Sequence, residues 1–169
     1  MSGAGGLDIW TFALAVYARP GVEAACLHLQ DRRGLDVCVV LFALWAGSVC
    51  GARLTPAEMG RLAADARRWQ DEVVGPLRTV RRRLKAGPPP APSPATERLR
   101  TGLKALEVDA ERLVLDRLAG LSGLAPDGGG GAGRVRTADA VRANLTLLLP
   151  DSGADDRAAL ETLVAATTA

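Results

Sequence analysis

The chain has 169 residues, of which 48% are hydrophobic and 24% are charged, and its formal net charge is +2. This composition excludes disordered and fibrous proteins and is typical of a soluble chain with a hydrophobic core, in one domain or one domain plus an appendage. Ala and Leu are abundant whereas Ile is nearly absent, which favours helices packed on helices over a β-sheet. We therefore expect an all-α fold: a helical bundle with a helical C-terminal extension.

Two short helices are predicted near the N-terminus, after residues 1–7, which we expect to be disordered. Asp8 can cap the first helix, which runs to about Arg19 and carries apolar residues on two stripes. A Pro-Gly pair then breaks the chain, and a second short helix follows that ends near Gly34.

A buried helix and an amphipathic helix are predicted next. Asp36 can cap the buried one, over residues 37–49, where the length and the lack of alternation favour a helix although the valines leave a strand open. Thr-Pro-Ala-Glu at residues 55–58 forms a capping box with Pro at the first helical position, the clearest local signal in the chain. A Gly-Pro pair at residues 75–76 is expected to stop and restart this helix.

Two segments divide the chain into regions. Residues 87–95 are rich in Pro and predict a stiff, extended linker, whereas residues 126–136 are rich in Gly and predict a flexible one. We therefore expect a core helical domain over residues 8–86, a helix over residues 96–125 and a C-terminal helical hairpin over residues 137–169.

The helix after the Pro-rich linker carries apolar residues at heptad spacing within residues 96–121. The seam consists of Leu99, Leu103, Leu106, Ala110 and Leu113. Because such a seam needs a partner helix, self-association of the chain through this helix is one expectation.

The ends of the C-terminal hairpin helices are predicted from their capping residues. Thr137 can cap the first helix, and Pro150 ends it. Asp155 and Asp156 then lie in the N-terminal turn of the last helix, where negative charge is favourable.

Three cysteines and the apolar runs bear on localisation. An odd number of cysteines without a CxxC pair argues against a disulfide framework or a zinc ribbon. No secretory signal pattern is present, and the longest uncharged apolar run, residues 37–52, is shorter than the ~20 residues of a membrane span. We expect a cytoplasmic protein.

Residue types that carry catalysis are scarce. His28 is the only histidine, and Cys26, two positions away on a helix, points to a different face. Cys26 and Cys38 fall on apolar stripes and are expected to be core residues. No metal-ligand spacing is present, so we name no catalytic residue, metal or cofactor, and expect a protein that is not an enzyme.

The most distinctive surface feature is a basic segment between Arg78 and Lys104, with eight bases and one acid. If the helices on either side of the Pro-rich linker fold back on each other, these bases gather at one end of a hairpin. The residues predicted to bind a partner are Arg78, Arg81, Arg82 and Lys85. We expect an adaptor or regulatory protein that binds an acidic protein through this face.

Four alternatives to an acidic protein partner stay open for the basic face. The same basic face could bind an anionic membrane or a nucleic acid. It could also be a solvated face, or one paired with acids of the following helix, Glu107, Asp109 and Glu111.

Residues 10–37 carry a long and specific spacing, W-x-F-A-x3-Y-x2-P-G-V-x2-A-C-L-x-L-Q-D-x2-G-x-D-V, and the similarity continues through Trp45 and Trp69 to Lys85. Over residues 8–86 the chain thus resembles an uncharacterised family of small bacterial proteins of unknown function. The resemblance implies a small, bacterial, cytosolic protein and supplies no activity. In that family Asn commonly follows the Asp-Val pair, whereas this chain has Cys38, so no polar role is carried over to that position.

Polar residues of this signature are candidates for a pocket. Gln30, Asp31 and Asp36 flank the turn between two predicted helices, where their default role is capping. The alternative is a small-molecule binding or enzymatic site at the end of the helix pair, with one aromatic side chain as its apolar wall. Its candidate residues are Trp10, Tyr17, Arg19, Gln30 and Asp31.

Overall fold

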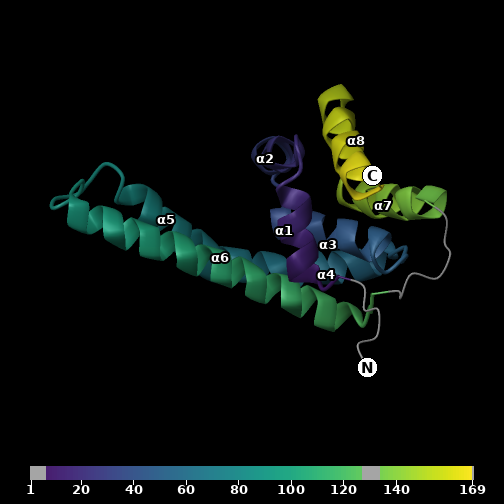
Figure 1. Cartoon of the computed structure of the whole chain (residues 1–169), viewed down its shortest axis with the longest axis horizontal. Helices are drawn as coiled ribbons and strands as arrows, with labels where there is room; N and C mark the ends of the chain where they lie inside the picture. Colours follow the sequence, from purple (N-terminus) through teal and green to yellow (C-terminus); the bar gives the residue numbers. More distant parts are fainter. Residues whose placement is uncertain (1–6, 127–133, 169) are drawn as a thin grey trace.

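The computed structural model of the chain describes residues 7–126 and 134–168, and within these ranges it contains helices and no strand. The helices are α1 (Ile9–Tyr17), α2 (Val22–Arg33), α3 (Val37–Ser48), α4 (Pro56–Trp69), the π-helical turn η1 (Gln70–Val74), α5 (Gly75–Arg83), α6 (Pro94–Ser122), α7 (Arg134–Leu148) and α8 (Ala154–Thr168). The expected all-α bundle is confirmed (Figure 1). The predictions for residues 1–6 and 127–133 concern positions outside the described residues.

The helix α3 is the centre of the core, and nearly all of its side chains are buried. Asp36 caps it by accepting a hydrogen bond from the backbone N–H of Cys38 at 2.8 Å, so the strand alternative is wrong. Trp45 donates its indole N–H to the carbonyl oxygen of Leu7 at 3.0 Å, which satisfies the one polar atom of this large core side chain. Among the helices that the structure describes, none is both long and apolar enough to cross a membrane.

The first two helices differ in detail from their predictions. Asp8 caps α1 as expected, but the helix ends at Tyr17, and Leu14, which belongs to the first of the two apolar stripes, is exposed. The helix α2 continues to Arg33, where Gly34 adopts the left-handed conformation with φ 67° that ends many helices. Gln30 and Asp31 therefore lie inside α2 and not in the turn.

The prediction that the helix stops at Gly75–Pro76 and a new helix begins there is wrong. The capping box at residues 55–58 starts α4 as predicted, but the helix passes through η1 and continues directly into α5. In the π-helical turn the N–H of Gly75 reaches the carbonyl oxygen of Gln70, five residues back. Such a turn absorbs the Pro ring and its missing N–H without ending the helix.

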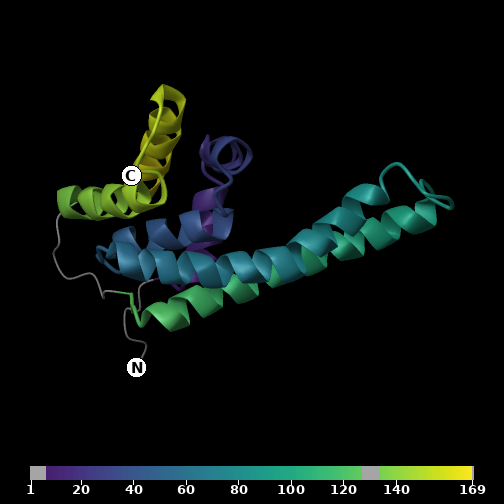
Figure 2. The ribbon, with the colours of Figure 1, turned by 180° about the vertical axis from the view of Figure 1, so that it is seen from behind.

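The helices α5 and α6 run antiparallel and form an arm that extends away from the other helices (Figures 1 and 2). Residues 84–93 connect the two helices at the tip of this arm, so most of the Pro-rich segment forms the turn of one hairpin. Ser93 caps α6, which therefore begins before the predicted residue 96.

The buried face of α6 differs from the predicted heptad seam. Ala110 is buried, whereas Leu99, Leu106 and Leu113 are 54%, 53% and 58% exposed. The residues that α6 buries are Thr96, Glu107, Ala110, Val114, Leu115 and Leu118. Most of the seam is thus exposed within residues 7–126 and 134–168.

The C-terminal helices pack directly on the N-terminal ones. α7 lies against α3, and α8 lies against α2, and Val141, Leu145 and Leu163 join the same core as the residues of α3. α7 begins at Arg134, so Thr137 lies inside this helix and does not cap it. Its end at Leu148 and the two acidic residues in the first turn of α8 are as predicted.

Candidate functional site

A cleft of about 560 Å³ lies between α1 and α2 on one side and the arm of α5 and α6 on the other. The N-terminal end of α3 contributes residues to it as well. Its lining residues include Trp10, Leu14, Tyr17, Leu27, Gln30, Asp36, Cys38, Arg78, Arg81, Arg82, Lys104, Glu107 and Glu111. Its volume is in the range of sites that bind small molecules or the side chains of a partner helix.

The wall formed by α1 and α2 is apolar and partly exposed. Leu14 is 53% exposed and Leu27 is 42% exposed. Trp10 and Tyr17 are half-buried, and the guanidinium of Arg112 lies 5.6 Å from the centre of the Trp10 ring. Burial raises the pKa of Tyr17 above its usual value, so its hydroxyl stays protonated at neutral pH. This wall can contact apolar groups and donate one phenolic hydrogen bond.

The cleft brings together residues from both sets of candidate site residues. Trp10, Tyr17 and Gln30 of the predicted pocket line it. Arg19 does not, because its guanidinium donates a hydrogen bond to the carbonyl oxygen of Ala166 in α8. Asp31 is exposed on α2 outside the cleft.

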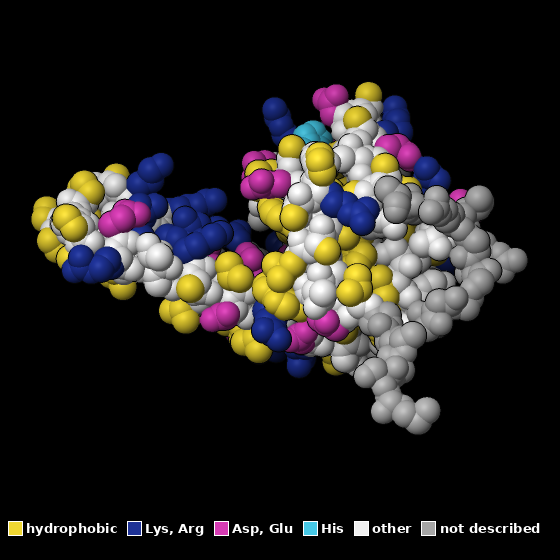
Figure 3. Space-filling model, in the orientation of Figure 1, with side chains coloured by type: hydrophobic (Ala, Val, Ile, Leu, Met, Phe, Trp, Pro, Cys, Tyr) yellow, Lys and Arg dark blue, Asp and Glu magenta, His cyan; other side chains and the backbone are white. Residues whose placement is uncertain are grey.

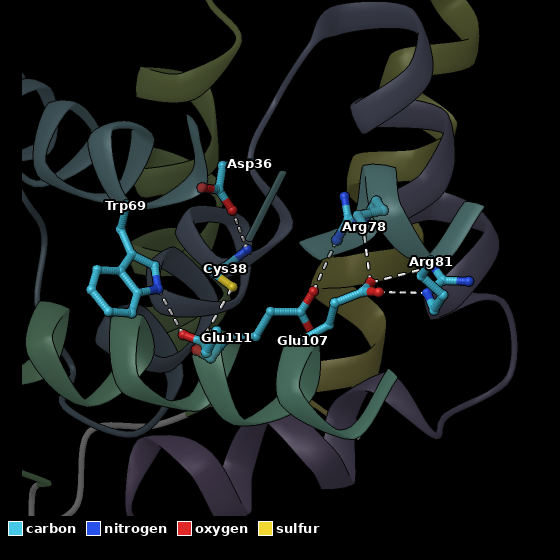
Figure 4. A network of polar contacts seen from close by, with 8 residues as sticks. Asp36, Cys38, Trp69, Arg78, Arg81, Glu107 and Glu111 are labelled. Carbon is cyan, nitrogen blue, oxygen red and sulfur yellow. Dashed lines mark hydrogen bonds and ion pairs between the residues drawn. The ribbon is translucent and has the colours of Figure 1, made fainter. Parts of the chain in front are cut away.

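Of the predicted partner-binding residues, Arg78 and Arg81 are engaged within the chain (Figure 4). Arg81 binds Glu107 through two hydrogen bonds, of 2.5 and 3.3 Å. Arg78 lies 3.6 Å from Glu107 and donates to Glu111 at 3.0 Å. Glu107 is only 1% exposed, and a buried carboxylate needs compensating positive charge. Arg78 and Arg81 therefore compensate the negative charge of Glu107 between α5 and α6.

The charges available to a partner are the exposed ones. Arg82 and Lys104 line the cleft and are exposed, and Lys85 is exposed further along the arm. Within the described part of the chain neither Arg82 nor Lys104 has an acidic group within 4 Å. The space-filling view shows dark blue side chains gathered on the side of the arm that faces α1 and α2 (Figure 3). The basic face is thus smaller than predicted and borders the cleft.

The two carboxyl oxygens of Asp36, a residue that lines the cleft, differ in their hydrogen bonding. Its Oδ1 atom accepts the capping hydrogen bond from Cys38, whereas Oδ2 is buried and has no hydrogen-bond partner within the described residues. Burial raises the pKa of Asp36 and that of Glu111 above their usual values. The orphaned oxygen is a ready acceptor for a donor group.

The cysteines near the cleft are core residues, as expected. Cys26 and Cys38 are buried free thiols. Burial raises the pKa of Cys26 to about 11 and that of Cys38 well above its usual value. Neither thiol ionises near neutral pH, so neither has the reactivity of a nucleophile. Among residues 7–126 and 134–168, no three His, Cys, Asp or Glu side chains are arranged to hold a metal ion.

Nothing in the sequence indicated two features of the site: the contact of Arg112 with Trp10 and the orphaned oxygen of Asp36. The pairing of the basic face with acids of the following helix was one of the predicted alternatives, and it is confirmed for Glu107 and Glu111. These two residues are four positions apart and so share one face of α6.

Comparison with known proteins gives a family without a known activity. A search of the curated proteins found no match, and neither did a search of the solved structures. One family model matches residues 8–118, which extend from α1 through most of α6 and include every residue that lines the cleft. The match continues beyond residue 86, where the resemblance in the sequence ended. The chain belongs to the family described as "Protein of unknown function (DUF2390)".

Proposed function

We propose that the protein is a non-enzymatic adaptor or regulatory protein that binds an acidic, amphipathic helix of a partner protein in the cleft between α1–α2 and the α5–α6 arm. The single observation that carries this proposal is that an apolar wall of the cleft faces a basic wall. Exposed Leu14 and Leu27 lie across the cleft from exposed Arg82 and Lys104. A helix with one apolar and one acidic face matches both walls at once.

The ion pairs of the arm support this choice of ligand. Glu107 and Glu111 already neutralise Arg78 and Arg81, so among the bases that line the cleft only Arg82 and Lys104 are exposed. Binding by charge alone, as on a membrane or a nucleic acid, draws on many Lys and Arg side chains. A cleft with two accessible bases and a leucine-bearing wall favours a ligand that contributes apolar contacts as well.

A fluorescein-labelled peptide tests the proposal. The probe is an ~18-residue helix with Leu at i, i+3, i+4 and i+7 and Glu on the other face, titrated with the full chain and followed by anisotropy. We expect binding at low salt that weakens in ~0.5 M salt. Reversing Arg82 and Lys104 to Glu should lower the affinity at least ~10-fold. The same charge change at exposed Arg32 and Arg53, outside the cleft, should leave it within ~2-fold.

The apolar wall requires its own variant. Leu14→Ser with Leu27→Ser removes exposed apolar surface without touching the core and should weaken the peptide at least ~10-fold. A peptide with Lys in place of Glu should not bind. Absence of binding at low salt, or binding that all variants retain, would refute the proposal. If anionic vesicles or single-stranded DNA bind through Arg82 and Lys104 while the peptide does not, the basic face binds phosphates instead.

The second candidate is a small-molecule binding or enzymatic site at the base of the same cleft, favoured by the orphaned Oδ2 atom of Asp36. Gln30 and Tyr17 line the cleft with it, so a ligand with an ammonium or amide donor fits this end. Alkyl amines and guanidines should then raise the unfolding temperature of the wild type but not of the Asp36→Asn variant. A panel that leaves the wild type unchanged dismisses this candidate.

The cellular setting is part of the proposal. We expect a bacterial and cytoplasmic protein, as the resemblance implies. The buried thiols of Cys26 and Cys38 support a reducing compartment, where such cysteines persist without pairing. Localisation of a tagged full-length chain by cell fractionation tests this expectation.

A further inference from the structure

Three leucines form an exposed row along α6. Leu99, Leu106 and Leu113 follow one another at intervals of seven residues and are each more than half exposed. Seven residues are nearly two full helical turns, so the three side chains lie within ~20° of one line that is ~21 Å long. Gly102, between the first two leucines, has open space at the position of a Cβ atom. A second helix can therefore approach this face closely.

The leucine row is separate from the cleft. None of its three residues lines the cleft, whereas Glu107 and Glu111 of the same helix do. In Figures 1 and 2 the far half of α6 has only α5 beside it. Hydrophobic side chains are also visible along the edge of the arm that faces away from α1 and α2 in Figure 3. A partner on the row would thus leave the cleft accessible.

We propose that this face binds a second copy of the chain, with the two α6 helices antiparallel. A two-fold axis at Leu106 places Leu99 of one copy opposite Leu113 of the other, so that one row covers the other. The arms then form an arrangement of four helices, two from each copy. This inference is independent of the proposed function, because the two surfaces share no residue.

Charge complementarity favours the second copy and its direction. Arg98 and Asp116 lie on the same side of the leucine row, each ~80° around the helix from Leu106. In the antiparallel pair, Arg98 of one copy falls within two residues, ~3 Å along the axis, of Asp116 of the other. A parallel pair would instead leave Arg98 of one copy ~27 Å along the axis from Asp116 of the other, so the two charges could not pair.

Both charged residues are available for this contact. Arg98 is exposed and has no acidic group within 4 Å in the described part of the chain. Asp116 has Arg112 at 3.8 Å, with both side chains more than half exposed. An exposed pair of this kind contributes little and rearranges easily.

Sedimentation velocity of the full chain from ~1 to ~200 µM tests the proposal, a range that brackets the affinity of a small, single-helix interface. We expect a reversible dimer. Leu106→Glu, which would place two carboxylates at the two-fold axis, should abolish it. Leu14→Glu is the matched control, since Leu14 is equally exposed but lies in the cleft. A wild-type chain that stays monomeric, or a dimer that survives Leu106→Glu, overturns the proposal.

A charge swap tests the direction. Arg98→Asp and Asp116→Arg should each weaken the dimer at least ~5-fold, and the double variant should restore it. Circular dichroism should show unchanged helix content in all variants, because the altered side chains are exposed. Single variants that leave the dimer intact would overturn the antiparallel arrangement.

Discussion

Gly47 in α3 lies directly against the backbone of Val141 in α7. A Cβ atom on Gly47 would be 2.7 Å from the backbone nitrogen of Val141 and 2.8 Å from its Cα atom. Real Cβ atoms do not approach that closely, and a backbone cannot yield as a flexible side chain can. The missing side chain at this position is what allows α7 to dock on the central helix.

Replacing Gly47 with Ala should therefore destabilise the protein by about 2–3 kcal/mol, because the overlap forces α3 and α7 apart. Gly60 in α4 is the matched control, since its Cβ position is open. Gly60→Ala should stabilise the protein by up to ~1 kcal/mol through helix propensity. Urea unfolding of both variants measures the difference. Equal effects of the two substitutions would show that α7 does not pack as described.

Asn144 joins α7 to the chain around α3 through a fully buried side chain. Its amide group donates to the carbonyl oxygens of Ala43 and Ala52, at 3.3 and 2.9 Å, and accepts from the N–H of Leu54 at 2.9 Å. Asn144→Ala removes all three hydrogen bonds and leaves the half-buried backbone groups of Ala52 and Leu54 without this partner, so we expect a loss of about 2–4 kcal/mol in unfolding free energy. The exposed Thr146→Ala on the same helix should change it by less than ~0.5 kcal/mol.

Glu107 holds the arm together through its two arginines. Glu107→Ala leaves Arg78 and Arg81 without their shared carboxylate, and we expect a loss of about 3 kcal/mol in unfolding free energy, measured by urea unfolding. The Arg142–Glu161 pair has a similar geometry but exposed side chains. Glu161→Ala should therefore leave the unfolding midpoint nearly unchanged. If both variants behave alike, burial does not strengthen the Glu107 pair.

Asp36 should make stability fall as the pH rises above its usual pKa. Burial raises the pKa of the folded carboxyl above its usual value of 3.8, so the folded state binds this proton more tightly than the unfolded state does. The stabilisation from this group is complete below the unfolded pKa and is lost as the pH rises through the folded pKa. Asp36→Asn keeps a capping side chain and lacks the titration.

The measurement for Asp36 is urea unfolding of wild type and variant at several pH values between ~4 and ~7. The Asn variant should gain stability relative to wild type as the pH rises. Asp36→Ala also removes the titration but loses the cap, which should cost ~1 kcal/mol at every pH. A constant difference between wild type and the Asn variant would contradict the raised pKa.

Local chemistry predicted much of the helical structure. Asp8, Asp36 and the box at residues 55–58 each satisfy backbone N–H groups at a helix start, and this requirement depends only on neighbouring residues. The same reasoning failed at Gly75–Pro76, because a π-helical turn gave the Pro ring room to continue the helix. It failed at Thr137 because residues further upstream also joined α7.

The candidate site was predicted only in parts. The sequence predicted a pocket at Trp10, Tyr17 and Gln30. It also predicted a separate partner surface that includes Arg78, Arg81 and Arg82. It did not predict that these two groups line one cleft. Their proximity depends on how the arm packs against α1 and α3. Contacts between residues so far apart in the chain leave no periodic pattern.

The sequence by itself determined the fold class, most helix starts and the family, because composition, capping residues and motif spacing are local properties of the chain. The tertiary structure alone decided which face of each helix is buried. The leucine row of α6 is exposed and Glu107 is buried, the reverse of what their polarity predicts. The reason is that Arg78 and Arg81 of α5 compensate the charge of the Glu107 carboxylate. The hairpin places α5 against this face of α6.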